Sequence, residues 1–123
     1  MHNFNNLKIW QLAIELAKEI YRTTESYPKE EIYALISQMQ RAAVSIPSNI
    51  AEGAGRETDK DFSHFLSIAL GSSFELYTQI VLSKEIGYID HTQTEKLQKM
   101  TIELQKMISA YKKKIDNNSQ TTK

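Results

Sequence analysis

Apolar side chains recur every three or four residues along four segments of this chain, a spacing that places them on one face of an α-helix. The first segment should be capped by Asn5 or Asn6 and should end before Tyr27-Pro28, because the residue before a proline is pushed out of the α region. Its stripe is Leu7, Trp10, Ala13, Ile14, Ala17, Ile20, Tyr21 and Thr24.

The second segment should begin near Lys29, with acidic residues in its first turn. Its stripe is Ile32, Leu35, Ile36, Met39, Ala42, Ala43, Ile46 and Ile50. Pro47 lies inside this stripe and the periodicity continues through it, so we predict one helix kinked at Pro47 rather than two helices. Gly53 and Gly55 should end it, because glycine adopts a left-handed cap without strain.

Thr58 is the expected cap of the third helix, and Gly87 is the expected residue at its end. The third stripe is Phe62, Phe65, Leu66, Ala69, Ser72, Ser73, Leu76, Ile80 and Ile86. Asp90 and Gln93 have the spacing of a capping box for the fourth helix. The fourth stripe is Leu97, Met100, Leu104, Met107, Ile108, Tyr111 and Ile115. The polar tail, 116–123, is expected to be disordered.

Four amphipathic helices with short connections predict an all-α, up-and-down antiparallel four-helix bundle, with one domain over residues 1–115. Cysteine is absent, which excludes a disulfide framework and thiolate metal sites. The N-terminus lacks the pattern of a signal peptide, and no uninterrupted apolar run approaches the roughly 18 residues of a membrane span. We therefore expect a cytoplasmic protein without a membrane partner.

The second helix also carries a polar stripe, which continues on the third helix beside the small residues Ala69, Gly71, Ser72 and Ser73. The stripe consists of Arg41, Ser45, Ser48, Asn49, Glu52, Arg56, Glu75 and Gln79. Three interpretations are open: a hydrogen-bonded network that fixes helix register within one subunit, a seam between subunits, or a ligand site. Arg41 and Glu75 are a candidate ion pair within it.

No catalytic, metal or cofactor site is expected from the residue types. His2, His64 and His91 lack a histidine partner one helical turn away, and Asp61-x-x-His64 is only one of the two such pairs that a di-iron bundle needs. No serine lies in a nucleophile elbow. The run 53–56, Gly-Ala-Gly-Arg, lacks the Gly-Lys-Ser/Thr ending of a phosphate loop and follows a helix, so we interpret it as a helix end.

Basic residues gather near the C-terminus although the formal net charge is zero. Lys99, Lys106 and Lys113 are spaced by seven residues, hence on one helical face, with Lys96 adjacent. The stripe is a candidate for phosphate contacts. The competing interpretation is a solvated face near a helix C-terminus, where cations are favoured.

Three tyrosines fall off the apolar stripes: Tyr33, Tyr77 and Tyr88. Aromatic side chains outside the core are typical anchors of protein interfaces. We therefore predict that this bundle is not a monomer.

The run 41–53, Arg-Ala-Ala-Val-Ser-Ile-Pro-Ser-Asn-Ile-Ala-Glu-Gly, closely resembles the signature of four-helix-bundle proteins encoded by intervening sequences in large-subunit ribosomal RNA genes. Further matches are Leu-Lys-Ile-Trp-Gln at 7–11, Phe62 to Leu66, 68–72, Glu75-Leu76-x-x-Gln79 and Gly-Tyr-Ile at 87–89. The same family includes the accessory protein of diversity-generating retroelements, which partners a reverse transcriptase and nucleic acid.

The resemblance implies a four-helix fold and a ring-shaped homopentamer, with no known enzymatic activity. Two features depart from the family: Gln40 stands where a second arginine is usual, and the net charge is zero where the retroelement proteins are strongly basic. We expect a non-enzymatic homo-oligomeric module that contacts RNA, or a nucleic-acid-associated protein, through basic patches. The alternative is a protein-binding adaptor or scaffold with no nucleic-acid role.

Overall fold

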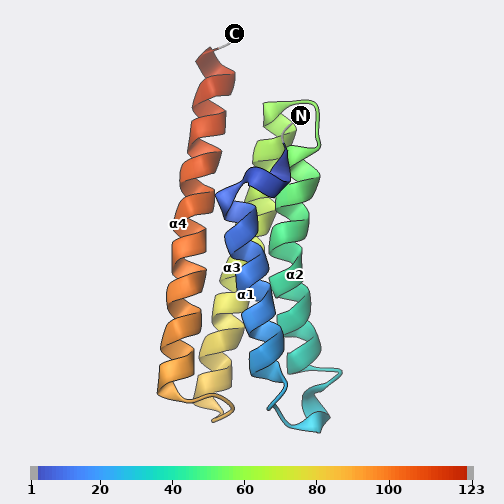
Figure 1. Cartoon of the computed structure of the whole chain (residues 1–123), viewed down its shortest axis with the longest axis vertical. Helices are drawn as coiled ribbons and strands as arrows, with labels where there is room; N and C mark the ends of the chain where they lie inside the picture. The colour runs from blue at the N-terminus through green and yellow to red at the C-terminus, as the bar shows by residue number, and fades with distance from the viewer. Residues whose placement is uncertain (1–2, 122–123) are drawn as a thin grey trace.

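The computed structural model describes residues 3–121, with side chains placed for residues 3–118. Four α-helices, α1 (Lys8–Thr24), α2 (Leu35–Ala54), α3 (Asp59–Glu85) and α4 (His91–Thr121), run antiparallel to their neighbours in chain order (Figure 1). Two short 3₁₀ helices, η1 (Phe4–Asn6) and η2 (Lys29–Glu31), precede α1 and α2. No strand occurs within the described residues, so the predicted all-α four-helix bundle is confirmed.

The core is formed by one apolar stripe from each helix, as the periodicity predicts. Burial of each large side chain contributes about 1.5–3 kcal/mol relative to exposure. Its largest fully buried members are Leu16, Ile20, Met39, Ile46, Ile50, Phe62, Leu66, Leu76, Ile80, Leu97, Leu104 and Ile108.

α1 ends at Thr24, as the Tyr27-Pro28 pair predicts, but its start differs from the expectation. Neither Asn5 nor Asn6 caps it; Leu7 occupies the cap position without a side-chain bond. Asn3 instead accepts a hydrogen bond from the Asn5 backbone N–H and so caps the preceding η1.

α2 begins at Leu35, not near Lys29, so that expectation is wrong. The acidic residues start the short η2, and the chain then breaks at Ala34, whose backbone lies outside the helical region (φ −125°, ψ −106°). Glu31 accepts a 3.3 Å hydrogen bond from the Leu35 N–H and so supplies the missing cap. Ile32 lies before this break and is exposed rather than in the core.

α2 passes through Pro47 as one helix, which confirms that the segment is not two helices. The kink itself stays a prediction. At its end, Gly53 is inside the helix and Gly55, the C-cap, has right-handed backbone angles (φ −84°), so the predicted left-handed glycine cap is wrong. Gly53 serves packing instead: a Cβ there would lie 2.7 Å from the Phe65 Cβ and 2.9 Å from the Phe62 ring.

The caps of α3 follow the prediction. The Thr58 hydroxyl accepts a 3.1 Å hydrogen bond from the Asp61 N–H at the start. At the end, Gly87 has a positive φ of 87°, and its N–H and that of Tyr88 donate to the carbonyls of Lys84 and Ser83. These paired bonds form a Schellman motif. Ile86, which the apolar stripe includes, is nearly half exposed because it lies beyond the last helical turn.

α4 has half of the predicted capping box and a longer course than expected. Asp90 accepts a 2.8 Å hydrogen bond from the Gln93 N–H, but the Gln93 side chain donates to the Thr23 hydroxyl on α1 instead of turning back. The helix continues to Thr121, so the described part of the expected disordered tail is helical; residues 122–123 lie outside the described residues. Asp116, the first residue of that tail, forms a 3.1 Å ion pair with Lys112.

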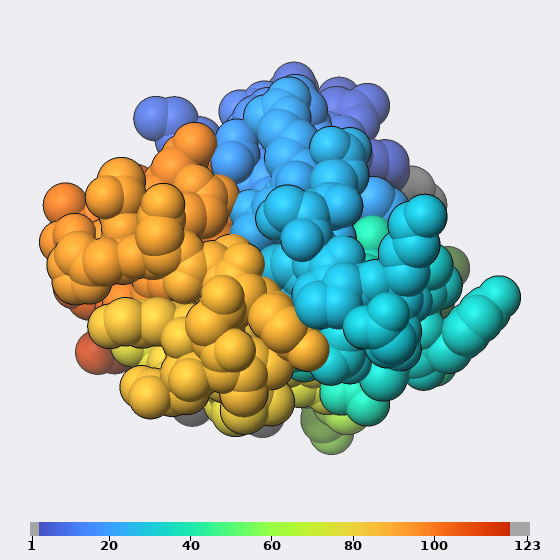
Figure 2. Space-filling view, turned by 90° about the horizontal axis from the view of Figure 1, so that it is seen from below, coloured from blue at the N-terminus to red at the C-terminus, as the bar shows by residue number. Residues whose placement is uncertain are grey.

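The two connections at one end of the bundle contact each other, α1 to α2 and α3 to α4 (Figure 2). Tyr27 and Tyr88 pack with ring centroids 5.1 Å apart, and the Tyr88 hydroxyl donates a 2.7 Å hydrogen bond to Glu31. We call these three residues the tyrosine clasp. The clasp joins the α1–α2 connection to the α3–α4 connection, at the end of the bundle opposite the α2–α3 connection.

Candidate interaction surface

The polar stripe predicted on α2 faces α3, and part of it forms a hydrogen-bonded network within the chain. The hydroxyls of Ser45 and Ser72 lie 2.8 Å apart, and the Asn49 amide donates to both the carbonyl and the hydroxyl of Ser45. The hydroxyls of Ser45 and Ser72 and the Asn49 amide nitrogen therefore have partners between α2 and α3. This is the register network that the small residues of α3 suggest.

Next to this network, a shallow groove of about 300 Å³ opens between α2 and α3. Its walls carry Gln38, Arg41 and Ala42 from α2, with Glu75 and Gln79 from α3. Arg41 and Glu75 are both exposed, and neither forms an ion pair within the described residues. The predicted Arg41–Glu75 pair within one chain is therefore wrong.

Gln79 is the buried polar residue of this groove. Its side chain is 8% exposed, and its Oε1 accepts no hydrogen bond although the atom is out of contact with solvent. A buried acceptor without a donor costs about 1–3 kcal/mol in a folded chain. Gln79 lies beside two charged side chains, Arg41 and Glu75, that form no ion pair within the described residues. The groove of the single chain therefore lacks partners for several of its polar groups.

The rest of the predicted stripe does not converge on the groove. Ser48 is exposed on α2. Near the end of that helix, Glu52 and Arg56 form a solvent-exposed ion pair of 3.7 Å, and the Arg56 guanidinium lies 4.8 Å from the centre of the Phe65 ring. These contacts fix the end of α2 onto α3.

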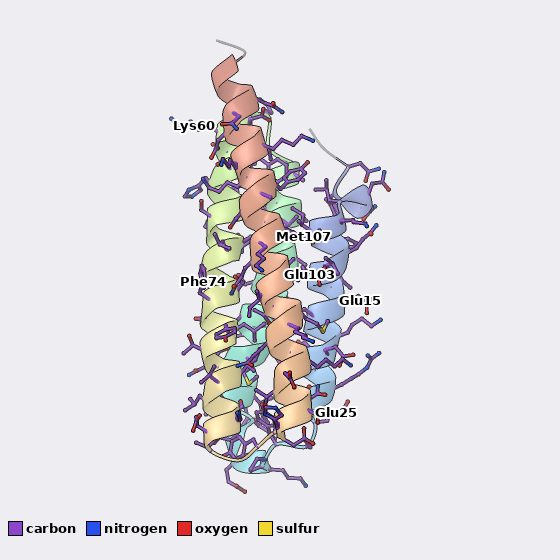
Figure 3. All side chains as sticks on the ribbon, turned by 90° about the vertical axis from the view of Figure 1, so that its left-hand side faces the viewer. Glu15, Glu25, Lys60, Phe74, Glu103 and Met107 are labelled. Carbon is purple, nitrogen blue, oxygen red and sulfur yellow. The ribbon has the colours of Figure 1, made fainter. Side chains whose placement is uncertain are left out.

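The exposed side of α3 carries large apolar side chains among polar ones. These are Ile68, Phe74 and Leu82, and Ile86 follows at the end of the helix. Phe74 is 56% exposed and stands on the outer edge of α3 (Figure 3). By length and mean hydropathy alone, α3 could cross a membrane, a property that core helices of globular proteins share. Serines and a glycine interrupt its apolar residues, so the absence of an uninterrupted apolar run is unaffected. A helix that is apolar on most sides is usually covered by a partner or buried.

Gly71, one of the small residues that the sequence places beside the polar stripe, lies exposed on α3. A Cβ added at Gly71 would meet nothing within 4 Å, so packing inside the chain does not explain a glycine there. Glycine in the middle of a helix costs about 0.5–1 kcal/mol relative to alanine. The sequence already indicates this, because the helical periodicity continues on both sides of Gly71 and the residue lies at neither a helix cap nor a turn.

The three off-stripe tyrosines occupy different environments. Tyr33 is 96% exposed immediately before the break at Ala34, and Tyr77 is half-buried. Tyr88 is an intramolecular contact rather than an exposed anchor, because it packs in the tyrosine clasp. The hydrogen bond to Glu31, followed by burial, raises the pKa of the Tyr88 hydroxyl.

The structure separates the four predicted lysines into two groups. Lys99, Lys106 and Lys113 are exposed without an ion pair, and their spacing along the helix axis is about 10.5 Å. At 100° per residue they stand opposite the buried face of α4. Lys96 instead forms a 3.2 Å ion pair with Glu19 of α1. Burial alone would raise the pKa of Glu19, but the charges of Lys96 and Arg22 lower it overall.

Among residues 3–118, no three His, Asp or Glu side chains lie close enough to hold a metal ion. His64 is exposed on α3 with its ring 5.8 Å from that of Phe65, and His91 lies 3.5 Å from Glu95. His2 lies outside the described residues.

Comparisons with known proteins agree with the fold. The family model described as 23S rRNA-intervening sequence protein matches residues 5–110. A crystal structure of a Bacteroides thetaiotaomicron protein of unknown function, from the S23 ribosomal protein family, superposes with a TM-score of 0.79 at 24% identity. The match covers 85% of this chain and 95% of that one. No functionally curated protein matches this chain in sequence.

Proposed function

The chain belongs to the family of 23S rRNA-intervening sequence proteins, and on that premise we propose that it is a homo-oligomeric, non-enzymatic interaction module that contacts RNA. The observation that carries self-association is the apolar outer face of α3, where Ile68, Phe74 and Leu82 are exposed in the single chain. Several large apolar side chains exposed along one helix are typical of a surface that is covered in an assembly. A ring-shaped homopentamer is the assembly that the family resemblance favours.

Self-association is tested by measuring the solution mass at micromolar concentration. We expect five times the chain mass of 14.1 kDa by light scattering or sedimentation equilibrium. A mass equal to one chain would remove the assembly from the proposal.

RNA contact is supported by Lys99, Lys106 and Lys113, which are exposed on the outer side of α4 and form no ion pair with the side chains of residues 3–118. Three phosphate contacts give weak, salt-dependent binding. When several copies engage one strand, avidity raises the overall affinity without any new contact. The protein would then act in the cytoplasm, where such RNA is available.

The RNA role is tested by titrating the protein with single-stranded and structured RNA at low and near-physiological salt. Lys99→Glu/Lys106→Glu should abolish binding, because it turns two attractive charges into repulsive ones. Lys60→Glu/Lys84→Glu is the matched control: it makes the same change in net charge on α3, at exposed lysines without ion pairs. Equal losses in both variants would indicate a net-charge effect rather than a lysine face.

The alternative function is a protein-binding adaptor or scaffold with no nucleic-acid role. The exposed Tyr33 and Phe74 favour it, since exposed aromatic side chains anchor protein interfaces. Absence of RNA binding at low salt, with the assembly intact, would select this function. Weak electrostatic contacts are strongest at low salt, so that condition is the most permissive test.

A further inference from the structure

α3 carries a second apolar stripe beside the one that fills the core. Its members are spaced by four, three and four residues, which is the spacing of one helical face. They are Leu70, Phe74, Tyr77 and Val81. Phe74 is exposed and the other three are partly exposed (Figure 3). We call this set the Phe74 flank.

Contacts of α3 with its two neighbouring helices fix the direction in which the Phe74 flank faces. The Ser72 hydroxyl lies 2.8 Å from the hydroxyl of Ser45 on α2, whereas the Ser63 hydroxyl bonds to Asp116 on α4. At about 100° per residue, Phe74 lies about 20° from the direction of Ser63. The Phe74 flank is therefore on the α4 side of α3.

A different pair of exposed apolar residues lies on the α2 side of the same helix. Ile68 and Leu82 lie about 40° and 80° from the direction of Ser72, on its solvent side. We call these two residues the Ile68 flank. Glu75 lies between them along the helix, and Arg41 of α2, a charge of opposite sign, lines the same groove.

The surface that includes both flanks has almost no charge. Residues 62–83 include one carboxylate, that of Glu75, and no lysine or arginine. The exposed residues between the flanks are small: Ser67, Gly71 and Thr78. When a helix packs against its own copies, charges of the same sign come close together and repel each other. A helix with so few charges is therefore suited to contact with a second copy of this chain.

The angle between the two flanks matches a closed ring. At about 100° per residue, Phe74 diverges from Leu82 by about 80° and from Ile68 by about 120°. In a ring of five identical chains, the directions from one chain to its two neighbours diverge by about 108°. This angle lies within the range that the two flanks span. A two-fold dimer, by contrast, uses a single patch on both copies.

We infer that α3 lines the inside of the ring and that the Ile68 flank of each copy packs on the Phe74 flank of the next copy. The inference rests on the proposed self-association and adds the two surfaces that form the contact. The contact is head-to-tail, so each copy uses one flank for each neighbour. Gly71 lies between the flanks and so faces the centre of the ring, where a side chain has no contact to make within its own chain.

Mixing two defective variants tests the head-to-tail contact. Ile68→Glu/Leu82→Glu removes one flank and Phe74→Glu removes the other. Each should raise the dissociation constant of the assembly at least tenfold, because it places a charge in an apolar contact. An equimolar mixture should form a dimer of twice the chain mass of 14.1 kDa, because each variant keeps the flank that the other lacks. Sedimentation equilibrium over a range of concentrations measures both effects.

Ile32→Glu and Tyr33→Glu are the matched controls. Both residues are exposed apolar or aromatic side chains, but they lie in the connection between α1 and α2 rather than on α3. The same chemical change there should leave the wild-type mass unaltered. Helical content and thermal unfolding are measured for every variant, so that loss of assembly is not confused with loss of structure.

Each outcome has a distinct meaning. If the variants of either flank keep the wild-type mass, the inferred contact is wrong, and the proposed self-association still stands. If both variants dissociate but their mixture keeps the mass of one chain, the contact is not head-to-tail and the inference is overturned. A monomeric wild-type protein would overturn the contact and the proposed assembly together. If that monomer also floated with phosphatidylcholine vesicles, a lipid surface would be the occupant of this side of α3.

Discussion

Gly53 and Gly71 are both helical glycines, but their surroundings give them opposite roles. Gly53 lies where α2 touches α3, with Phe65 Cβ only 2.7 Å from an added Cβ. Gly53→Ala should therefore destabilise the fold by about 1–3 kcal/mol, because overpacking forces backbone or side-chain shifts. Gly71→Ala should stabilise the single chain by about 0.5–1 kcal/mol, since the Cβ meets nothing. Urea unfolding of both variants measures whether the free energy of unfolding falls for Gly53→Ala and rises for Gly71→Ala.

The Tyr88 hydroxyl gives the clasp a pH dependence. Its hydrogen bond to Glu31 raises the pKa of Tyr88 in the folded state above the ordinary value of 10.0. The stabilisation is fully present below that ordinary value and is lost as the pH rises through the raised folded pKa. Urea stability measured from pH 8 to 11 should fall less steeply in Tyr88→Phe than in the wild type.

Tyr88→Phe should also lower stability at neutral pH, because Glu31 loses a hydrogen-bond donor. Tyr33→Phe is the appropriate comparison, since the Tyr33 ring is 96% exposed and its hydroxyl has no hydrogen-bond partner. If the free energy of unfolding of Tyr88→Phe and of the wild type fell equally between pH 8 and 11, the Tyr88 hydroxyl would not be the cause of this pH dependence.

At the scale of the element, the last turns of α4 depend on contacts beyond their own helix. The Ser63 hydroxyl of α3, followed by Lys112, lowers the pKa of Asp116 below its ordinary value of 3.8. Asp116→Asn should cost a few tenths of a kcal/mol near pH 7, because the ion pair is solvent-exposed. The effect is present above the ordinary pKa and should disappear as the pH falls through the lowered folded value.

The contact between α3 and α4 can be isolated with a double-mutant cycle. Asp116→Asn and Ser63→Ala should be non-additive at pH 7, and should become additive as the pH falls below the lowered folded pKa of Asp116, where the carboxylate is protonated in both states. Additive losses already at pH 7 would assign the stabilisation of Asp116 to Lys112 alone.

Local signals predicted the elements, and contacts between distant residues explain where the prediction was wrong. Thr58 and Gly87 act through neighbours in sequence, so periodicity and capping rules located both ends of α3. The start of α2 depends on the Glu31 side chain, and the role of Gly53 depends on phenylalanines of the next helix. No spacing rule reports such contacts.

For the candidate interaction surface too, local spacing predicted which residues lie together but not which of them form contacts. Helical spacing placed Arg41, Ser45, Glu75 and Gln79 together, and all four line the same groove. The spacing left the direction of each side chain open, so it suggested an Arg41–Glu75 pair that the structure lacks. Lys96 was grouped with the other lysines because its partner, Glu19, is 77 positions away in the chain.

At the scale of the whole molecule, assembly and RNA binding should be coupled. Phe74→Lys adds positive charge to each subunit, which on electrostatics alone would strengthen RNA binding. It also removes an exposed aromatic side chain from the face proposed for self-association, so its subunits should separate. If avidity within the assembly supplies most of the affinity, the same variant should bind RNA at least tenfold more weakly. Unchanged or tighter binding by a dissociated Phe74→Lys protein would show that single subunits suffice.

The tyrosine clasp makes the two ends of the bundle unequal. At the clasped end, the two connections join four helix termini, those of α1, α2, α3 and α4, so local opening there must break several contacts at once (Figure 1). At the other end, α4 continues to Thr121 while α1 begins at Lys8, and the last turns of α4 can open alone. Amide protons should therefore exchange with solvent fastest along this free end, and order should be lost from it toward the clasp.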